Sequence, residues 1–151
     1  MNPKVSSDIF LAPFYLIAAT FIGLADTLYL SYYKWLNIIP GCAIGGCETV
    51  LNDASSVPWG IIPLAYLGLI YYIVMLGLAI ILAAKPLSLR IKQMVLAYTT
   101  IGLLCSIYFE LYQYFAIGAL CMYCGISAIT TLVLFGLAVW HWRSTSPTPD
   151  A

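Results

Sequence analysis

The stretch that decides the fold is residues 93–140, QMVLAYTTIGLLCSIYFELYQYFAIGALCMYCGISAITTLVLFGLAVW, which carries one formal charge, at Glu110. As a continuous helix this stretch would extend roughly 70 Å, more than twice the hydrocarbon thickness of a bilayer. It must therefore fold back once, and the weakest point for a helix is Ile117-Gly118-Ala119. Two membrane spans are predicted, at about residues 94–116 and 120–142, joined by a very tight turn.

The rest of the chain has the same character. Of the 151 residues of the whole chain, 63% are hydrophobic and only 8% are charged, which excludes an ordinary soluble domain. Two further spans are predicted, at about residues 10–31 and 61–84. The first of these is longer than the apolar core of a secretory signal peptide. The fold class is thus an all-α integral membrane protein. We expect a four-helix transmembrane domain over residues 1–143 and a loose cytoplasmic tail over 144–151.

The charges predict how the bundle is oriented. Five basic residues flank the spans on one side, and Lys34 is the only one on the other. The five are Lys4, Lys85, Arg90, Lys92 and Arg143. Basic residues favour the cytoplasmic side, so both termini are expected there and the loop of about residues 32–59 is expected outside. His141, between two tryptophans, is predicted to be an anchor at the inner interface. The net charge is zero without a dense basic patch, which argues against nucleic acid as a partner.

Four of the five cysteines form two close pairs on the predicted outer side. Cys121 and Cys124 make a CxxC at the start of a span, so their sulfurs lie within one helical turn and can close a disulfide. Unpaired amides and the dipole at a helix start lower a thiol pKa. Cys42 and Cys47 lie in the glycine-rich GCAIGGC, whose freedom suits a thiol that moves between partners. The lone Cys105 is predicted to be a small core residue.

Several alternatives remain open for these polar residues. The loop pair could be a static disulfide that staples a purely structural bundle, and four thiolates could bind a metal such as zinc. Asp26 and Glu110 are ionisable groups inside spans, where a functional or paired role is the default hypothesis. Asp26 could instead extend to the outer interface, and Glu110 could be a proton donor or a neutral packing residue. Ser55 and Ser56 could cap a helix or donate to a carbonyl of a bound ring.

Taken together, these residues resemble the vitamin K epoxide reductase family, in its prokaryotic branch. The resemblance covers about residues 10–142. The matching motifs, in order, are the loop pair Cys42 and Cys47, the segment SSVPWG at 55–60, the entry GIIPLAYLG at 60–68, and the CMYC at 121–124.

The resemblance implies a four-helix bundle that encloses a quinone of the ubiquinone or menaquinone type, with a short lid from the outer loop. Cys121 and Cys124 would form the active-site disulfide. Cys124 would face the quinone, Cys121 would exchange with Cys47, and Cys42 would meet the thiols of a partner. The family's lid serine, a quinone contact, corresponds to Ser56 or Ser55.

We therefore expect an enzyme of the cell membrane, a thiol:quinone oxidoreductase that generates disulfide bonds in extracytoplasmic proteins. Electrons would pass from partner thiols through the loop pair and the CxxC pair to a membrane quinone, whose higher potential holds the cysteines oxidised. Because no further domain follows the bundle before Ala151, the expected electron donor is a separate thioredoxin-like extracytoplasmic protein. We expect no metal.

Overall fold

In the computed structural model, residues 3–42, 46–52 and 63–145 are described. Within these ranges the chain is helical, without strands. The elements in chain order are α1 (Pro3–Trp35), α2 (Cys47–Asn52), α3 (Leu64–Ala84), α4 (Leu89–Tyr112), the π-helical turn η3 (Gln113–Ile117) and α5 (Met122–Thr145).

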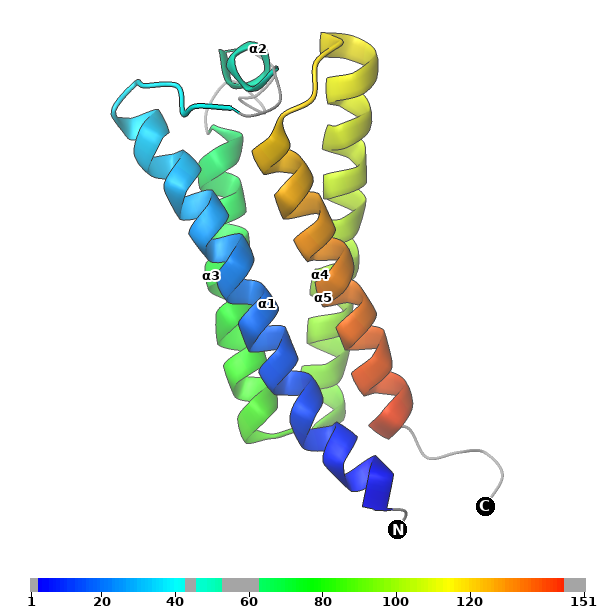
Figure 1. Cartoon of the computed structure of the whole chain (residues 1–151). Coiled ribbons are helices and arrows are strands. Elements are labelled where there is room, and N and C mark those ends of the chain that lie inside the picture. Colours follow the sequence, from blue (N-terminus) through cyan, green and yellow to red (C-terminus); the bar gives the residue numbers. More distant parts are fainter. Residues whose placement is uncertain (1–2, 43–45, 53–62, 146–151) are drawn as a thin grey trace.

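The four long helices form an elongated bundle (Figure 1). The short helix α2 lies across one end, which we call the loop end, whereas α1 begins and α5 ends at the opposite, terminal end. Helix α1 packs against both α3 and α5, and α4 packs mainly against α5. All four long helices are long and apolar enough to cross a membrane. The predicted four-helix membrane bundle is confirmed.

Helices α1 and α4 extend beyond the predicted spans, whereas α3 (Leu64–Ala84) lies within its predicted span of 61–84. Helix α1 continues to Trp35, and α4 begins at Leu89. Apolar composition marks only the part that fits the hydrocarbon, whereas helical hydrogen bonding continues into the polar flanks. The predicted reversal occurs between Ile117 and Met122, where Gly118 adopts a φ of 70°. This left-handed conformation is the one that glycine adopts without steric cost.

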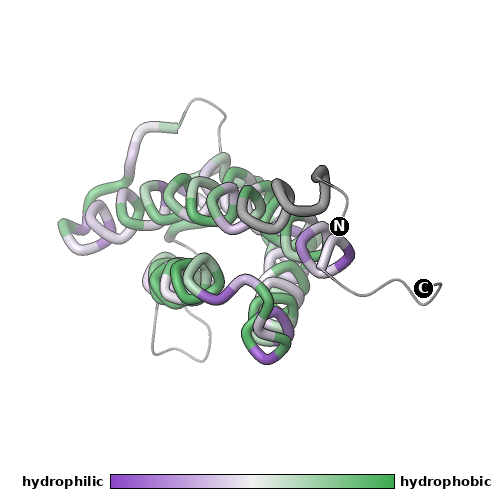
Figure 2. The backbone as a smooth tube through the Cα atoms, turned by 90° about the horizontal axis from the view of Figure 1, so that it is seen from below, coloured by the Kyte–Doolittle hydropathy of each residue, from purple (hydrophilic) through white to green (hydrophobic). Residues whose placement is uncertain are grey.

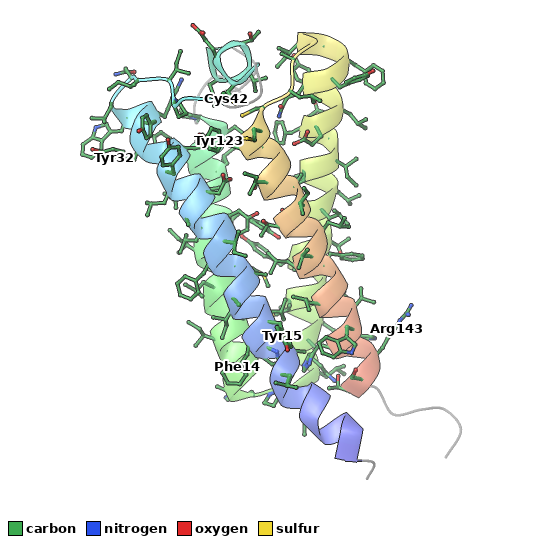
Figure 3. The ribbon with its side chains drawn as sticks, in the orientation of Figure 1. Phe14, Tyr15, Tyr32, Cys42, Tyr123 and Arg143 are labelled. Carbon is green, nitrogen blue, oxygen red and sulfur yellow. A yellow bond between two sulfur atoms is a disulfide. The ribbon has the colours of Figure 1, made fainter. Side chains whose placement is uncertain are left out.

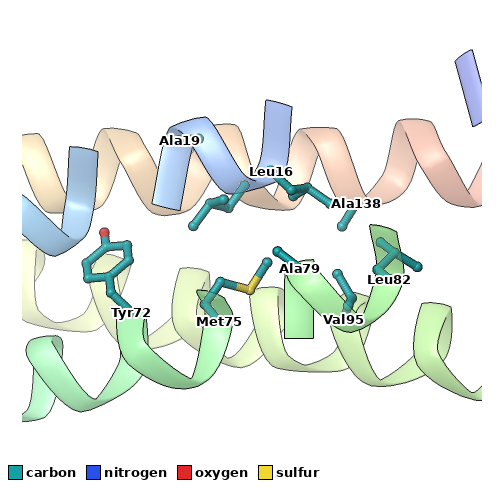
Figure 4. Packing of buried hydrophobic residues seen from close by; sticks show 9 residues of the cluster. Leu16, Ala19, Tyr72, Met75, Ala79, Leu82, Val95 and Ala138 are labelled. Carbon is teal, nitrogen blue, oxygen red and sulfur yellow. The ribbon is translucent and has the colours of Figure 1, made fainter. Parts of the chain in front are cut away.

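The core of the bundle is packed from apolar side chains of its long helices (Figure 4). It also contains a polar cluster around the Tyr72 hydroxyl. The Tyr72 ring is fully buried, and a Cβ atom at Gly23 of the neighbouring helix would overlap it. The Tyr72 hydroxyl lies 3.0 Å from the carbonyl oxygen of Ser127 and 3.4 Å from the Thr131 hydroxyl. These contacts tie α3 to α5 while leaving no buried hydroxyl unpaired at this position.

Large apolar side chains cover the outside of the bundle. Phe14, Phe115 and Ile129 are each more than 60% exposed, and apolar residues lie on all four long helices (Figure 2). A helix that is apolar on its outer face fits contact with lipid rather than water.

At the terminal end, one prediction is wrong. His141 is buried rather than interfacial, and its Nε2 lies 3.2 Å from the carbonyl oxygen of Pro86, so it ties α5 to the connection between α3 and α4. Lys92 is also buried, with Nζ donating to the Thr145 hydroxyl at 2.9 Å and lying over the Trp142 ring. The flanking tryptophans misled the interpretation of His141, because aromatic neighbours are typical of interfaces but do not determine which way the imidazole points.

Candidate redox site

The loop pair forms a disulfide at the loop end. Cys42 is bonded to Cys47, with 6.1 Å between their Cα atoms. Cys47 begins α2 and is fully buried, whereas Cys42 is half-buried. The two sulfurs of this disulfide therefore differ in surroundings, one facing the protein interior and the other nearer the surface.

The second pair stands where α5 begins. Cys121 directly precedes the helix, its carbonyl accepts a hydrogen bond from the Gly125 N–H at 3.0 Å, and its side chain is buried. Cys124 follows in the first turn and is half-buried. Both carry free thiols here, so the structure combines an oxidised loop pair with a reduced CxxC pair.

The two cysteine pairs contact each other through one sulfur atom of each pair. The Sγ atoms of Cys47 and Cys121 are 3.5 Å apart within a small buried cluster that also contains Val50. Gly46 permits this approach, because its φ is +118° and a Cβ atom there would lie 2.7 Å from the carbonyl oxygen of Leu120. Only glycine combines that backbone conformation with so close a neighbour. The glycine-rich loop thus brings its second cysteine against the first cysteine of the CxxC.

Side chains on both sides hold the loop in this position. Tyr123, between the two cysteines of the CxxC, donates its hydroxyl to the carbonyl oxygen of Gly41 at 2.8 Å. Figure 3 shows Tyr123 beneath the loop that carries Cys42. Lys34 at the end of α1 donates to the carbonyl oxygen of Leu51 in α2 at 3.4 Å. Helix α2 is therefore attached to α1, and the segment before it is attached to α5 at Gly41.

The electrostatic surroundings favour the ionised form of Cys121, which lies outside the membrane-spanning segments. A hydrogen bond with the Cys124 thiol lowers the pKa of Cys121 to about 7, helped by the backbone amides of Cys124 and Tyr123 and opposed by burial. These are the amides that a helix start leaves without partners, as the sequence predicted. A substantial fraction of Cys121 is thiolate at neutral pH.

A cavity of about 1090 Å³ lies inside the bundle next to this pair. All four long helices and α2 contribute to its mostly apolar lining, and Cys124 faces it. Two lining groups, the Asp26 Oδ2 and the Tyr71 hydroxyl, are buried without a hydrogen-bond partner among the described residues. Asp26 therefore points inward and does not reach the interface. Glu110 also borders the cavity.

The residue that sequence reasoning missed is Gln113, the first residue of η3. Its side chain is buried, and its Oε1 accepts a hydrogen bond from the Cys121 N–H at 3.0 Å. The available signal was the one carboxamide inside a mostly apolar span, because a polar group at membrane depth requires a partner.

The structure thus brings Cys42, Cys47, Cys121 and Cys124 together at one end of the bundle. The predicted serines, Ser55 and Ser56, lie outside the described residues. Cys105 is exposed on α4, so its prediction as a core residue is wrong. Within the described ranges, no group of three or more histidine, cysteine, aspartate or glutamate residues is arranged to hold a metal ion.

Fold and site together define a multi-pass membrane protein with two cysteine pairs in contact beside an internal cavity. Residues 14–139 match the model of the vitamin K epoxide reductase family. The chain belongs to this family, as the resemblance implied. It is also similar to the thiol-disulfide oxidoreductase LTO1 of Arabidopsis thaliana, with 33% identity over 122 residues that cover 76% of this chain and 32% of that protein. The chain spans about a third of the length of this relative. Membership of the prokaryotic branch stays a prediction.

Proposed function

We propose that this protein is a quinone-coupled thiol oxidoreductase that generates disulfide bonds in extracytoplasmic proteins. The observation that carries the proposal is the 3.5 Å contact between Cys47 and Cys121. It links a loop disulfide at the end of the bundle to a thiol pair whose second member, Cys124, faces an apolar cavity. Such a chain of sulfurs is suited to move electrons from protein thiols to a lipid-soluble acceptor.

The proposed relay consists of successive thiol-disulfide exchanges. A partner thiolate attacks Cys42, and a second partner thiol resolves the mixed disulfide, which leaves the partner oxidised and the loop pair reduced. The Cys47 thiolate then attacks Cys121 of the disulfide between Cys121 and Cys124, the inner pair, and Cys124 leaves as a thiolate. Cys42 resolves the Cys47–Cys121 bond, re-forming the loop disulfide and releasing Cys121. Exchange is reversible. With the inner pair reduced and the loop pair oxidised, as in this structure, the Cys121 thiolate attacks Cys47, Cys42 leaves, and the same Cys47–Cys121 bond forms.

The cavity supports a quinone as the electron acceptor. Its apolar lining suits the ring and the isoprenoid tail. The partnerless Tyr71 hydroxyl could donate to one ring oxygen, and Asp26 in its protonated form could donate to the other. Cys124 borders the same space and would address the ring. The quinone, of the ubiquinone or menaquinone type, supplies an acceptor for two electrons and two protons as the inner disulfide re-forms. Ser55 or Ser56 is a further proposed contact.

The proposed donor is a separate thioredoxin-like extracytoplasmic protein, which would dock on the loop end. Cys42 is the more accessible sulfur of the loop disulfide, which supports its role as the point of attack. The charge bias supports cytoplasmic termini, since four of the five basic residues assigned to that side flank α3, α4 and α5 at the terminal end. The metal alternative has less support, because two of its four sulfurs form a disulfide.

The test is thiol-dependent reduction of short-chain ubiquinone and menaquinone by the purified full-length protein, followed by quinone absorbance. Cys121→Ala and Cys124→Ala should each reduce turnover to the rate without protein. Cys42→Ala should lose oxidation of a thioredoxin-like donor yet retain turnover with a small dithiol that reaches the inner pair directly. Ile129→Ala, which changes an exposed residue of α5 outside the cavity lining, is the control and should behave as wild type. Full quinone reduction by Cys124→Ala would refute the proposal.

A further inference from the structure

The relay does not use Gln113, although this residue is only 3% exposed and lines the cavity beside Cys124. A carboxamide offers one acceptor and two donors. The two ends of this side chain have different surroundings, and each end suggests a function.

The oxygen atoms of Gln113 organise the reversal between α4 and α5. Its backbone carbonyl accepts hydrogen bonds from the N–H groups of Gly118 and Ala119, the latter at 3.3 Å. Its side-chain Oε1 accepts from the Cys121 N–H at 3.0 Å. One residue therefore binds three amides of the connection and fixes the backbone of the cysteine that meets Cys47.

The nitrogen atom of the same side chain is buried and has no hydrogen-bond partner among the described residues. A buried amide without a partner is costly, which favours a use for it in another state of the protein. Gln113 and Cys124 line the same cavity. A thiol is a weak acceptor, but a thiolate accepts charge-assisted hydrogen bonds of about twice the ordinary strength.

We propose that Gln113 activates the inner disulfide by stabilising Cys124 as the leaving group of the exchange step. This inference rests on the relay proposed above. When the Cys47 thiolate attacks Cys121, the Cys47–Cys121 bond forms, the Cys121–Cys124 bond breaks, and the electron pair departs on Cys124. The Gln113 Nε2 then donates to the new thiolate, while Oε1 accepts from the Cys121 N–H and so holds the attacked cysteine in place. Charge and electrons balance without a further reactant, since one thiolate replaces another.

The experiment measures reduction of the inner disulfide by dithiothreitol in the full-length protein without quinone, with Cys42→Ala and Cys47→Ala present to remove the loop thiols. Because a better leaving thiolate departs faster, Gln113→Met should slow reduction about tenfold. Gln113→Glu keeps an acceptor for the Cys121 N–H but puts a carboxylate near the departing thiolate. It should slow reduction at least as much above neutral pH, where the carboxylate is ionised, and less at acidic pH, where the protonated acid can donate.

Gln93 provides the matched control, since it is exposed near the other end of α4. Gln93→Met and Gln93→Glu should reduce at the wild-type rate. If Gln113→Met does not fold, Gln113→Glu alone decides, and wild-type rates for it across the pH range would overturn the inference. Failure of the proposed function looks different, because the wild-type disulfide would then exchange normally with dithiothreitol but pass no electrons to quinone.

Discussion

The sulfur atoms of Cys47 and Cys121 lie 3.5 Å apart, although 74 residues separate them in the chain. Each belongs to a different pair, and their partners point in different directions, Cys42 toward the surface of the loop and Cys124 toward the cavity. Among the described residues, this contact is the point at which the two pairs can exchange electrons.

The Cys42→Ala, Cys124→Ala double variant should accumulate a Cys47–Cys121 disulfide. Both resolving thiols are then absent, so the mixed disulfide cannot proceed in either direction. Non-reducing proteolysis and mass spectrometry would detect the linked peptides. The matched variant, Cys47→Ala with Cys124→Ala, leaves Cys42 and Cys121 and should give little cross-link. A free Cys121 in the first variant under oxidising conditions would refute the relay.

Gly46→Ala should separate the two pairs without unfolding the bundle. The new Cβ atom would lie 2.7 Å from the Leu120 carbonyl oxygen, at a φ of +118° that alanine rarely adopts. Strain of about 1–2 kcal/mol should displace Cys47, reducing the rate of cross-linking to Cys121 about tenfold. Gly41→Ala is the control, because a Cβ atom there has no neighbour within 4 Å. Equal cross-linking rates with unchanged circular dichroism would show that the close approach is unimportant.

Alkylation of Cys121 should follow a titration centred near pH 7 in a Cys42→Ala, Cys47→Ala background. The hydrogen bond from Cys124 lowers the pKa of Cys121 to about 7, so reactivity should fall as the pH drops from 8 to 6. Adding Cys124→Ala should move the midpoint up toward the ordinary thiol value of about 8.5. Peptide mass spectrometry at a series of pH values measures both curves. Identical midpoints would contradict the assigned cause.

The same pKa has a consequence for stability. Because the folded-state pKa of Cys121 is lowered, its contribution to the free energy of unfolding is complete above the unfolded thiol value of about 8.5. The contribution is lost as the pH falls through about 7. Denaturation of the reduced protein between pH 6 and pH 9 should therefore show a gain in stability with pH that disappears in Cys121→Ala.

The proposed orientation predicts which residues an impermeant reagent can reach. Ser88 lies in the connection between α3 and α4 at the terminal end, away from the loop pair. After reduction, intact cells should be labelled at Cys42 or Cys47 but not at a cysteine introduced as Ser88→Cys. Labelling of the Ser88→Cys variant only after the membrane is opened is the positive control. Labelling at Ser88→Cys in intact cells would invert the topology.

The bundle and the approximate position of the site follow from the sequence, because bilayer thickness limits the length of an apolar helix. Gly118 breaks the only stretch too long for one crossing, and the reversal brings the CxxC to the same end as the loop cysteines. The choice of Cys47 over Cys42 as the neighbour of Cys121 was implied by a family resemblance alone. It depends on the φ of Gly46 and the start of α2, which are tertiary properties.

Other features could not be predicted because they depend on which way a single side chain points. Gln113 and His141 both look like isolated polar residues at span ends, yet one accepts from a backbone amide and the other lies against a backbone carbonyl. Asp26 looked able to reach the interface, but its Oδ2 is buried. Periodicity and hydropathy describe faces and segments, and they do not reveal which buried atoms remain without partners.

The connection formed by residues 118–121 has a consequence for how such a chain can vary. It joins η3 to α5 by so few residues that the Cys121 amide meets Gln113 while its sulfur meets Cys47. Inserting even one residue would displace both contacts together, whatever its side chain. Natural variation and engineering alike should therefore leave the length of this connection unchanged while its side chains differ, and an alignment of functional relatives should show no gap at this place.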